Sequence, residues 1–255
     1  MIEFPVDPGR RLVDAARPYL APVVGEIGWF GFFLLLAPVI GPRGYGLFTL
    51  AISGIAIAEV LLVEPAARAL RRIAAPEERH WSTMLVTMMG LGAATSFGLY
   101  AVAGPVTAVV GEEGFGDIFR SLAVLPLLGA LTVVPRAALR REGRAAVVSA
   151  AGVAGVVAGG GIGVALAWAG EGPWSLVAQI VVQRLVECTV LWGVPGERIG
   201  IIWSPRHFAD LAKAADRSAL ADVCPALGAH GRCILIGVLL GPTATEIMMF
   251  TTAKR

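Results

Sequence analysis

The sequence predicts an all-α membrane protein with about seven transmembrane helices. Stretches of about twenty mostly apolar residues recur along the chain, which is the length that an α-helix needs to cross a bilayer. The composition agrees, because 56% of the residues are hydrophobic, 16% are charged and the mean hydropathy is +0.73. The basic residues fall almost entirely in alternate gaps between the apolar stretches. The predicted spans are 20–41, 45–64, 83–104, 118–138, 145–169, 173–193 and 219–240.

The first two spans are separated by a helix-breaking pair. Span 20–41 follows a short basic segment, is long enough to cross the bilayer and lacks a clear small-residue cleavage site, so it predicts a transmembrane helix and not a secretory signal. Gly41 and Pro42 then end this helix and start the next, because proline lacks the amide that a helix interior needs and suits a first turn.

Proline and glycine shape two of the later spans. Pro126 falls inside span 118–138, where we expect it to kink the helix. Span 145–169 is apolar all round, as a buried or lipid-covered helix is. Its glycines at 155, 159 and 163 form a double GxxxG pattern, which predicts close packing against a neighbouring helix.

The arginines and lysines predict the orientation. A cytoplasmic N-terminus places fifteen basic residues on the cytoplasmic side and only Arg43 and Arg120 on the other. The connecting segments are short enough for this bias to set the topology. We therefore expect cytoplasmic segments at 65–82, 139–144 and 194–218. The opposite loops carry acidic residues instead, namely Glu112, Glu113, Asp117 and Glu171.

An internal repeat suggests the domain organisation. Gly41–Pro42 recurs as Gly241–Pro242, with six spans between the two copies. Repeats separated by an even number of spans have the same orientation in the membrane, as in the parallel repeats of transporters. The chain then divides into an N-terminal six-helix bundle, a cytoplasmic linker, and the first helix and stub of a second bundle, at 1–195, 196–218 and 219–255.

Cysteine and histidine give no sign of catalytic or metal chemistry. The three cysteines have no CxxC spacing, and His80, His207 and His230 are scattered along the sequence. No spacing brings together a base, a nucleophile and an orienting group. We therefore expect no catalytic residue, no metal ligand and no cofactor. The basic residues are explained by topology and by anionic lipid headgroups, so no nucleic-acid partner is expected.

Four segments in order carry a resemblance to a known family. They read GPRGYGLFTLA from Gly41, LTVVPRAALRREGR at 131–144, GEGPWSLVAQ at 170–179 and RCILIGVLLGP at 232–242. Together they resemble the polysaccharide and O-antigen flippases, the Wzx-like members of the multidrug/oligosaccharidyl-lipid/polysaccharide exporter superfamily. The resemblance covers nearly the whole chain.

This resemblance implies a function without covalent chemistry. Such proteins have two helical bundles around a central cavity, and they move an undecaprenyl-pyrophosphate-linked oligosaccharide across the bacterial inner membrane by alternating access. The chain departs from the family where it ends, at the point where an eighth helix is expected. The resemblance therefore implies a gene fragment or a truncated product that needs a second bundle or another protomer beside the lipid bilayer.

A polar stripe on span 173–193 holds the candidate cargo site. Gln179, Gln183 and Glu187 recur every four residues, with Arg184 beside them. Two interpretations stay open. The stripe can line a cavity in which amides and a carboxylate bind sugar hydroxyls, while the guanidinium binds pyrophosphate. Alternatively, Arg184 and Glu187 pair with each other or with a neighbouring helix and hold the bundle together.

Two glutamates inside the first spans are candidates for ion coupling. Glu26 and Glu59 fall in apolar surroundings, where a carboxylate can take up a proton, as coupled transport requires. Buried structural hydrogen bonding is the other interpretation for both residues.

Three other functions remain as alternatives. A drug/cation antiporter of the same superfamily would need a cavity dominated by acidic residues. A membrane-embedded lipid transferase would need clustered acidic or histidine residues at a membrane face, and the loop sequences show none. A non-transporting fragment is the third alternative, because the chain ends early.

Overall fold

The computed structural model describes residues 38–194 and 200–215, together with eight single positions: Gly28, Gly31, Phe32, Leu35, Leu36, Gly228, Gly231 and Ile234. Within these residues all regular structure is helical. The helices are α2 (Pro42–Arg72), α3 (Glu78–Val110), α4 (Phe115–Leu122), α5 (Leu125–Arg141), α6 (Ala145–Trp168), α7 (Trp174–Gly193) and α8 (Pro205–Ala214).

In the described part of the chain, five membrane-capable helices confirm the predicted fold class and five of the predicted spans. They are Pro42–Arg72, Glu78–Val110, Phe115–Arg141, Ala145–Trp168 and Trp174–Gly193. The helix α2 begins where the Gly41–Pro42 pair predicts, with Gly41 at a positive φ of 79°, which favours glycine, and proline in the first turn. The chain is therefore an all-helical, multi-pass membrane protein.

The first and seventh predicted spans lie mostly outside the described residues. Gly28 and Phe32 of the first span are helical, and both lie against α6, where a β-carbon on Gly160 would be 2.4 Å from the ring of Phe32. Ile234 of the seventh span packs against the apolar core. Glu26, the second Gly-Pro pair and most of the predicted second-bundle segment lie outside the described residues.

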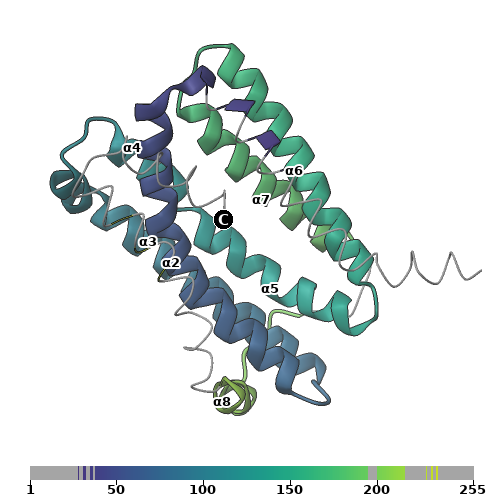
Figure 1. Ribbon diagram of the computed structural model, residues 1–255. Coiled ribbons are helices and arrows are strands. Elements are labelled where there is room, and N and C mark those ends of the chain that lie inside the picture. Colours follow the sequence, from purple (N-terminus) through teal and green to yellow (C-terminus); the bar gives the residue numbers. More distant parts are fainter. Residues whose placement is uncertain are drawn as a thin grey trace, which may run out of the picture.

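The helix α5 lies in the middle of the bundle. Figure 1 shows α5 between the antiparallel pair α6–α7 and the long helices α2 and α3, and all four neighbours contact it. Among the described residues the apolar core forms three clusters; the smallest joins α5, α6 and α7 at Leu139, Val148 and Leu191, and the two larger ones lie along the bundle. One gathers around Tyr45, Phe48 and Phe115, and the other around Leu70, Trp81 and Val134. On α2, the first of these clusters ends at Ile55 and the second begins at Leu62, so Glu59 lies between the two.

The two ends of the bundle differ in charge. We call the end where α2, α5 and α7 finish the basic end; it carries most of the described arginines, including Arg141, which donates to the carbonyls of Ile73 and Ala74 at 2.8 Å. The opposite end carries Glu113, Glu171 and an Arg43–Glu112 ion pair at 2.8 Å. Exposed tryptophans also lie near both ends, as at membrane interfaces: Trp168, Trp174, Trp192 and Trp203.

Two prolines affect α5: Pro126 lies at its start, and Pro135 lies inside it. The predicted span 118–138 breaks into α4 and α5 just before Pro126, which confirms the expected kink. Pro135 lies inside α5 and has no amide to donate to the carbonyl of Leu131. The indole N–H of Trp192 on α7 donates to that carbonyl at 3.1 Å. A side chain of a neighbouring helix thus replaces the missing backbone bond.

The double GxxxG pattern of α6 packs against α7, as expected. A β-carbon on Gly159 would lie 2.3 Å from the carbonyl oxygen of Gln179, and one on Gly155 would lie 2.6 Å from that of Gln183. These distances leave no room for a side chain. The two backbones therefore touch along this face.

The predicted cytoplasmic linker contains a short helix that the sequence analysis did not anticipate. The helix α8 has Ser204 at its N-cap and Pro205 in its first turn, a common way to start a helix. Leu211 of α8 is buried in the core cluster at the basic end. Figure 1 places α8 at that end, near the connection between α2 and α3.

Candidate functional site

Four charged side chains from three helices form a network inside the bundle. Arg184 on α7 pairs with Glu59 on α2 at 3.0 Å and with Glu187, one turn further along α7, at 3.7 Å. Glu187 also pairs with Arg136 on α5. We call these residues, Glu59, Arg136, Arg184 and Glu187, the charge network. Acidic and basic groups alternate along it, so its formal charges sum to zero.

The local sequence explains how these side chains reach one another. Glu59 approaches α5 over Gly129, where a β-carbon would lie 2.6 Å from the carboxylate oxygen Oε1. Arg184 and Glu187 are three residues apart, so they lie on the same side of α7. Arg184 is ten residues from the first residue of α7, which at 1.5 Å per residue is about 15 Å, half the thickness of a bilayer core.

The side chains of the charge network are largely buried, so their charges need partners. The side chains of Glu187 and Glu59 are 8% and 14% exposed, and both arginines are about a quarter exposed. An unpaired charge at the centre of a membrane helix costs about 2.5–3.5 kcal/mol on insertion scales. The ion pairs offset this cost. Nε of Arg136 is buried and has no hydrogen-bond partner among the described residues, so this guanidinium has unused donor capacity.

The predicted polar stripe of α7 divides between two neighbours. Arg184 and Glu187 lie toward α2 and α5, where the charge network forms. Gln179 and Gln183 lie against the glycines of α6, with the β-carbon of Gln183 2.9 Å from a β-carbon built on Gly159. The amide oxygens of both glutamines are buried without a hydrogen-bond partner in the described part of the chain. The four residues thus do not line one continuous surface.

The structure links candidates that the sequence analysis kept apart. Glu59 is a candidate for coupling and Arg184 a candidate for cargo binding, with structural pairing as the alternative for Arg184, and the two side chains form one ion pair. Arg136 is one of the fifteen basic residues that the charge pattern places on the cytoplasmic side, so its part in the site was not predicted. Its position inside the predicted span 118–138, directly after Pro135, was the signal that could have found it.

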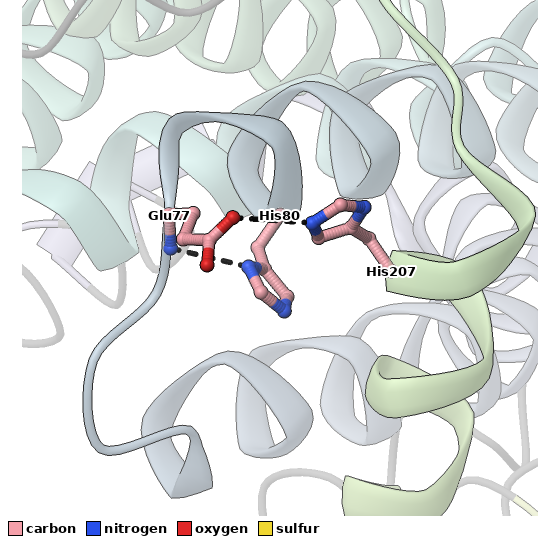
Figure 2. Close-up of side chains that lie close together, drawn as sticks. All are labelled: Glu77, His80 and His207. Atoms are coloured by element: carbon pink, nitrogen blue, oxygen red, sulfur yellow. Dashed lines mark hydrogen bonds and ion pairs between the residues drawn. The ribbon is translucent and has the colours of Figure 1, made fainter.

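Two of the histidines are not scattered in space, contrary to expectation. Figure 2 shows His80 of α3 and His207 of α8 beside Glu77, with ring centroids of the histidines 4.5 Å apart. Sequence spacing does not reveal this group, because 127 positions separate the two histidines. The expectation that no acidic and histidine residues cluster at a membrane face is therefore wrong for the basic end.

A helical multi-pass bundle that pairs charges inside its membrane-spanning part is typical of membrane transport proteins. The family comparison agrees with this class. Residues 35–254 match the model of the family described as polysaccharide biosynthesis protein, and the chain belongs to this family. The match supports a flippase-type membrane protein of polysaccharide biosynthesis. No curated protein and no solved structure matches the chain.

Proposed function

We propose that this chain forms the first bundle of a flippase that carries an undecaprenyl-pyrophosphate-linked oligosaccharide across the bacterial inner membrane. The basic end, with the N-terminus, faces the cytoplasm, and a second bundle completes the cargo cavity. Transport proceeds by alternating access and makes or breaks no covalent bond. The charge network carries this proposal, together with the family to which the chain belongs.

The network supports an anionic cargo because its arginines can exchange partners. A guanidinium binds carboxylate and phosphate with the same planar fork. Without cargo, Glu59 and Glu187 hold the two guanidinium groups in place and neutralise them. A pyrophosphate would replace the carboxylates at Arg184 and Arg136. Gln179 and Gln183 lie against α6, so in this conformation they are poorer candidates for sugar contacts.

The same pairing suggests how transport could be coupled to protons. A protonated Glu59 no longer neutralises Arg184, which leaves that guanidinium available to the cargo. Proton uptake by Glu59 and cargo binding by Arg184 would then favour each other. Glu26, on the first predicted span, remains a second candidate for ion coupling.

A net-neutral network gives less support to a drug/cation antiporter. A cationic cargo would have to bind beside two arginines, whose repulsion opposes the attraction of Glu59 and Glu187. An antiporter would confer resistance to cationic dyes, and we expect no change in such resistance when the gene is deleted.

The central test substitutes Arg184 at the native gene locus. Arg184→Lys should keep part of the export of surface polysaccharide, because it retains the charge and loses the bidentate fork. Arg184→Ala should abolish export and leave lipid-linked oligosaccharide in the inner leaflet. Surface polysaccharide and lipid-linked precursor are measured in the same cells.

A matched double variant separates cargo binding from folding. Arg184→Ala alone leaves Glu59 without its closest partner, which can destabilise the bundle. Arg184→Ala with Glu59→Gln removes both charges of the pair and should restore the folded yield while export stays absent. Normal export by this folded double variant would refute the cargo role of Arg184.

Labelling from outside the cell tests the proposed orientation. Single cysteines at Glu113 and at Glu171 should react with a membrane-impermeant maleimide in intact cells, whereas one at Arg141 should react only after lysis. The acidic end would then face outward. Labelling of the Arg141 position in intact cells, with none at the other two, would reverse the orientation.

A further inference from the structure

A second cluster, at the basic end of the bundle, joins two segments that are distant in sequence. Glu77 is the N-cap of α3, His80 lies in the first turn of α3, and His207 lies in the first turn of α8. Each offers one ligand atom, and these atoms all lie within 4.8 Å of one another. Figure 2 shows the carboxylate of Glu77 beside the two imidazoles. Both histidines are buried, whereas Glu77 is exposed.

Helix capping explains only part of this arrangement. The carboxylate of Glu77 and the ring of His80 satisfy each other's backbone amides at the start of α3, with the amide of Glu77 donating to Nδ1 of His80 at 3.1 Å. His207 comes from another helix and caps nothing in α3. Its Nε2 lies 3.3 Å from Oε2 of Glu77.

The hydroxyl of Ser204 orients His207 toward the carboxylate. Ser204 is the N-cap of α8, yet its side chain caps no amide and instead lies 2.8 Å from Nδ1 of His207. When Nδ1 donates to this hydroxyl, Nε2 is the unprotonated nitrogen of a neutral ring. A lone pair on Nε2 would then face the lone pairs of Glu77. In this tautomer a cation must lie between the two acceptors, whereas in the other tautomer Nε2–H donates to Glu77 directly and Nδ1 accepts from Ser204.

We propose that Glu77, His80 and His207 bind a divalent transition-metal ion such as Zn²⁺. Two imidazoles and one carboxylate are a ligand set that suits Zn²⁺, and the exposed side of Glu77 leaves a fourth position for water. When His207 binds the ion through Nε2, its Nδ1–H donates to the hydroxyl of Ser204, which then orients the ring as the partners of metal-binding histidines do. To bind through Nδ1, His80 must release the amide of Glu77.

The ion would fasten α8 to the start of α3. The segment before α8 already contacts α3, since the amide of Ser204 donates to Oγ1 of Thr83 at 3.3 Å. At its other end, α8 accepts a weak hydrogen bond from Arg72 of α2 at the carbonyl of Ala214. A metal ion would add a strong link between these contacts. It would therefore hold the segment that follows α7 against the basic end of the bundle.

Metal binding by the full chain tests the proposal. The protein is purified in detergent, stripped with a chelator and titrated with Zn²⁺ by isothermal titration calorimetry. We expect one tight site per chain, weakened at least tenfold by His207→Ala or His80→Ala. Ser204→Ala should weaken it by about 10–100-fold, as the loss of an orienting group does. Zn²⁺ should also slow amide hydrogen exchange in residues 200–215.

The remaining histidine and the metal-free proteins provide the controls. His230→Ala should leave the affinity for Zn²⁺ unchanged, which excludes incidental binding by any histidine. His207→Gln, which can still donate a hydrogen bond, replaces His207→Ala if the latter unfolds; equal thermal stability without metal shows that a variant is folded. Equal Zn²⁺ affinity in the wild type and a folded His207 variant would overturn the proposal. So would a folded wild type that binds no Zn²⁺, since a proton would then bridge Glu77 and His207.

Discussion

The helix α7 meets its neighbours through two different kinds of interface. Against α6 it packs backbone to backbone, with Gly155 and Gly159 opposite the carbonyl oxygens of Gln183 and Gln179. Against α2 and α5 it meets charged side chains, which pair through the charge network. The interface between α6 and α7 depends on close packing, and no other group can replace its contacts when the two helices separate. The second depends on charge, and another anion can take the place of a carboxylate.

This difference indicates where the bundle can move. Close packing of small residues admits few alternative arrangements, so α6 and α7 should move as one unit. Ion pairs at the other interface can break and reform when a proton or an anionic group arrives. We therefore expect any transport motion to separate the α6–α7 pair from α2 and α5.

The largest effect is expected at the fixed interface. Gly159→Leu should destabilise the protein by about 3 kcal/mol or more, at or above the usual range for overpacking, because the new side chain meets the backbone of α7. The folded yield and the thermal unfolding temperature in detergent would both fall. Gly161→Leu is the matched control on the same helix, since a β-carbon there meets none of the described residues within 4 Å. Tolerance of Gly159→Leu would show that α6 and α7 are not rigidly joined.

A smaller effect is expected at the exchangeable interface. Glu187→Gln removes the carboxylate that both arginines contact and should cost about 2 kcal/mol, between the values for exposed and fully buried pairs. Unfolding by denaturant in detergent measures the change. Glu113→Gln, at an exposed position of the acidic end, should change stability by less than about 0.5 kcal/mol. Equal effects of the two substitutions would mean that the network does not hold α7.

The smallest effect concerns the bond between Trp192 and α5. Trp192→Phe should cost about 1 kcal/mol, because it leaves the carbonyl of Leu131 without a donor. Pro135→Ala supplies a backbone amide for the same carbonyl, so Trp192→Phe should cost less in that background. A double-mutant cycle on unfolding free energies compares the two costs. Equal costs in both backgrounds would show that the indole contributes through packing alone.

Much of the fold could be predicted because the sequence of each helix contains the pattern that identifies that helix. Apolar length located the five described spans, Pro126 located the break between α4 and α5, and the glycine spacing of α6 indicated a close contact. Each of these patterns lies within about twenty-five residues. The short helix α8 was missed because its ten residues are too few and too polar to form an apolar span.

The site was harder to predict because its contacts join distant parts of the chain. The polar stripe marked Arg184 and Glu187, but nothing on α7 says that Glu59 or Arg136 lies opposite. Likewise, His80 and His207 become neighbours only when α8 folds back against α3. Periodicity reports which face of one helix is polar, and it does not report which helix that face meets.

The pair between Glu59 and Arg184 also has a consequence for biosynthesis. Glu59 leaves the ribosome 125 residues before Arg184. At roughly 5–20 residues per second, this interval lasts roughly 6–25 s. During that time α2 must enter the membrane without the arginine that neutralises its carboxylate. Until α7 arrives, Glu59 lacks this partner, so assembly of this bundle is sensitive to the order in which its helices are made.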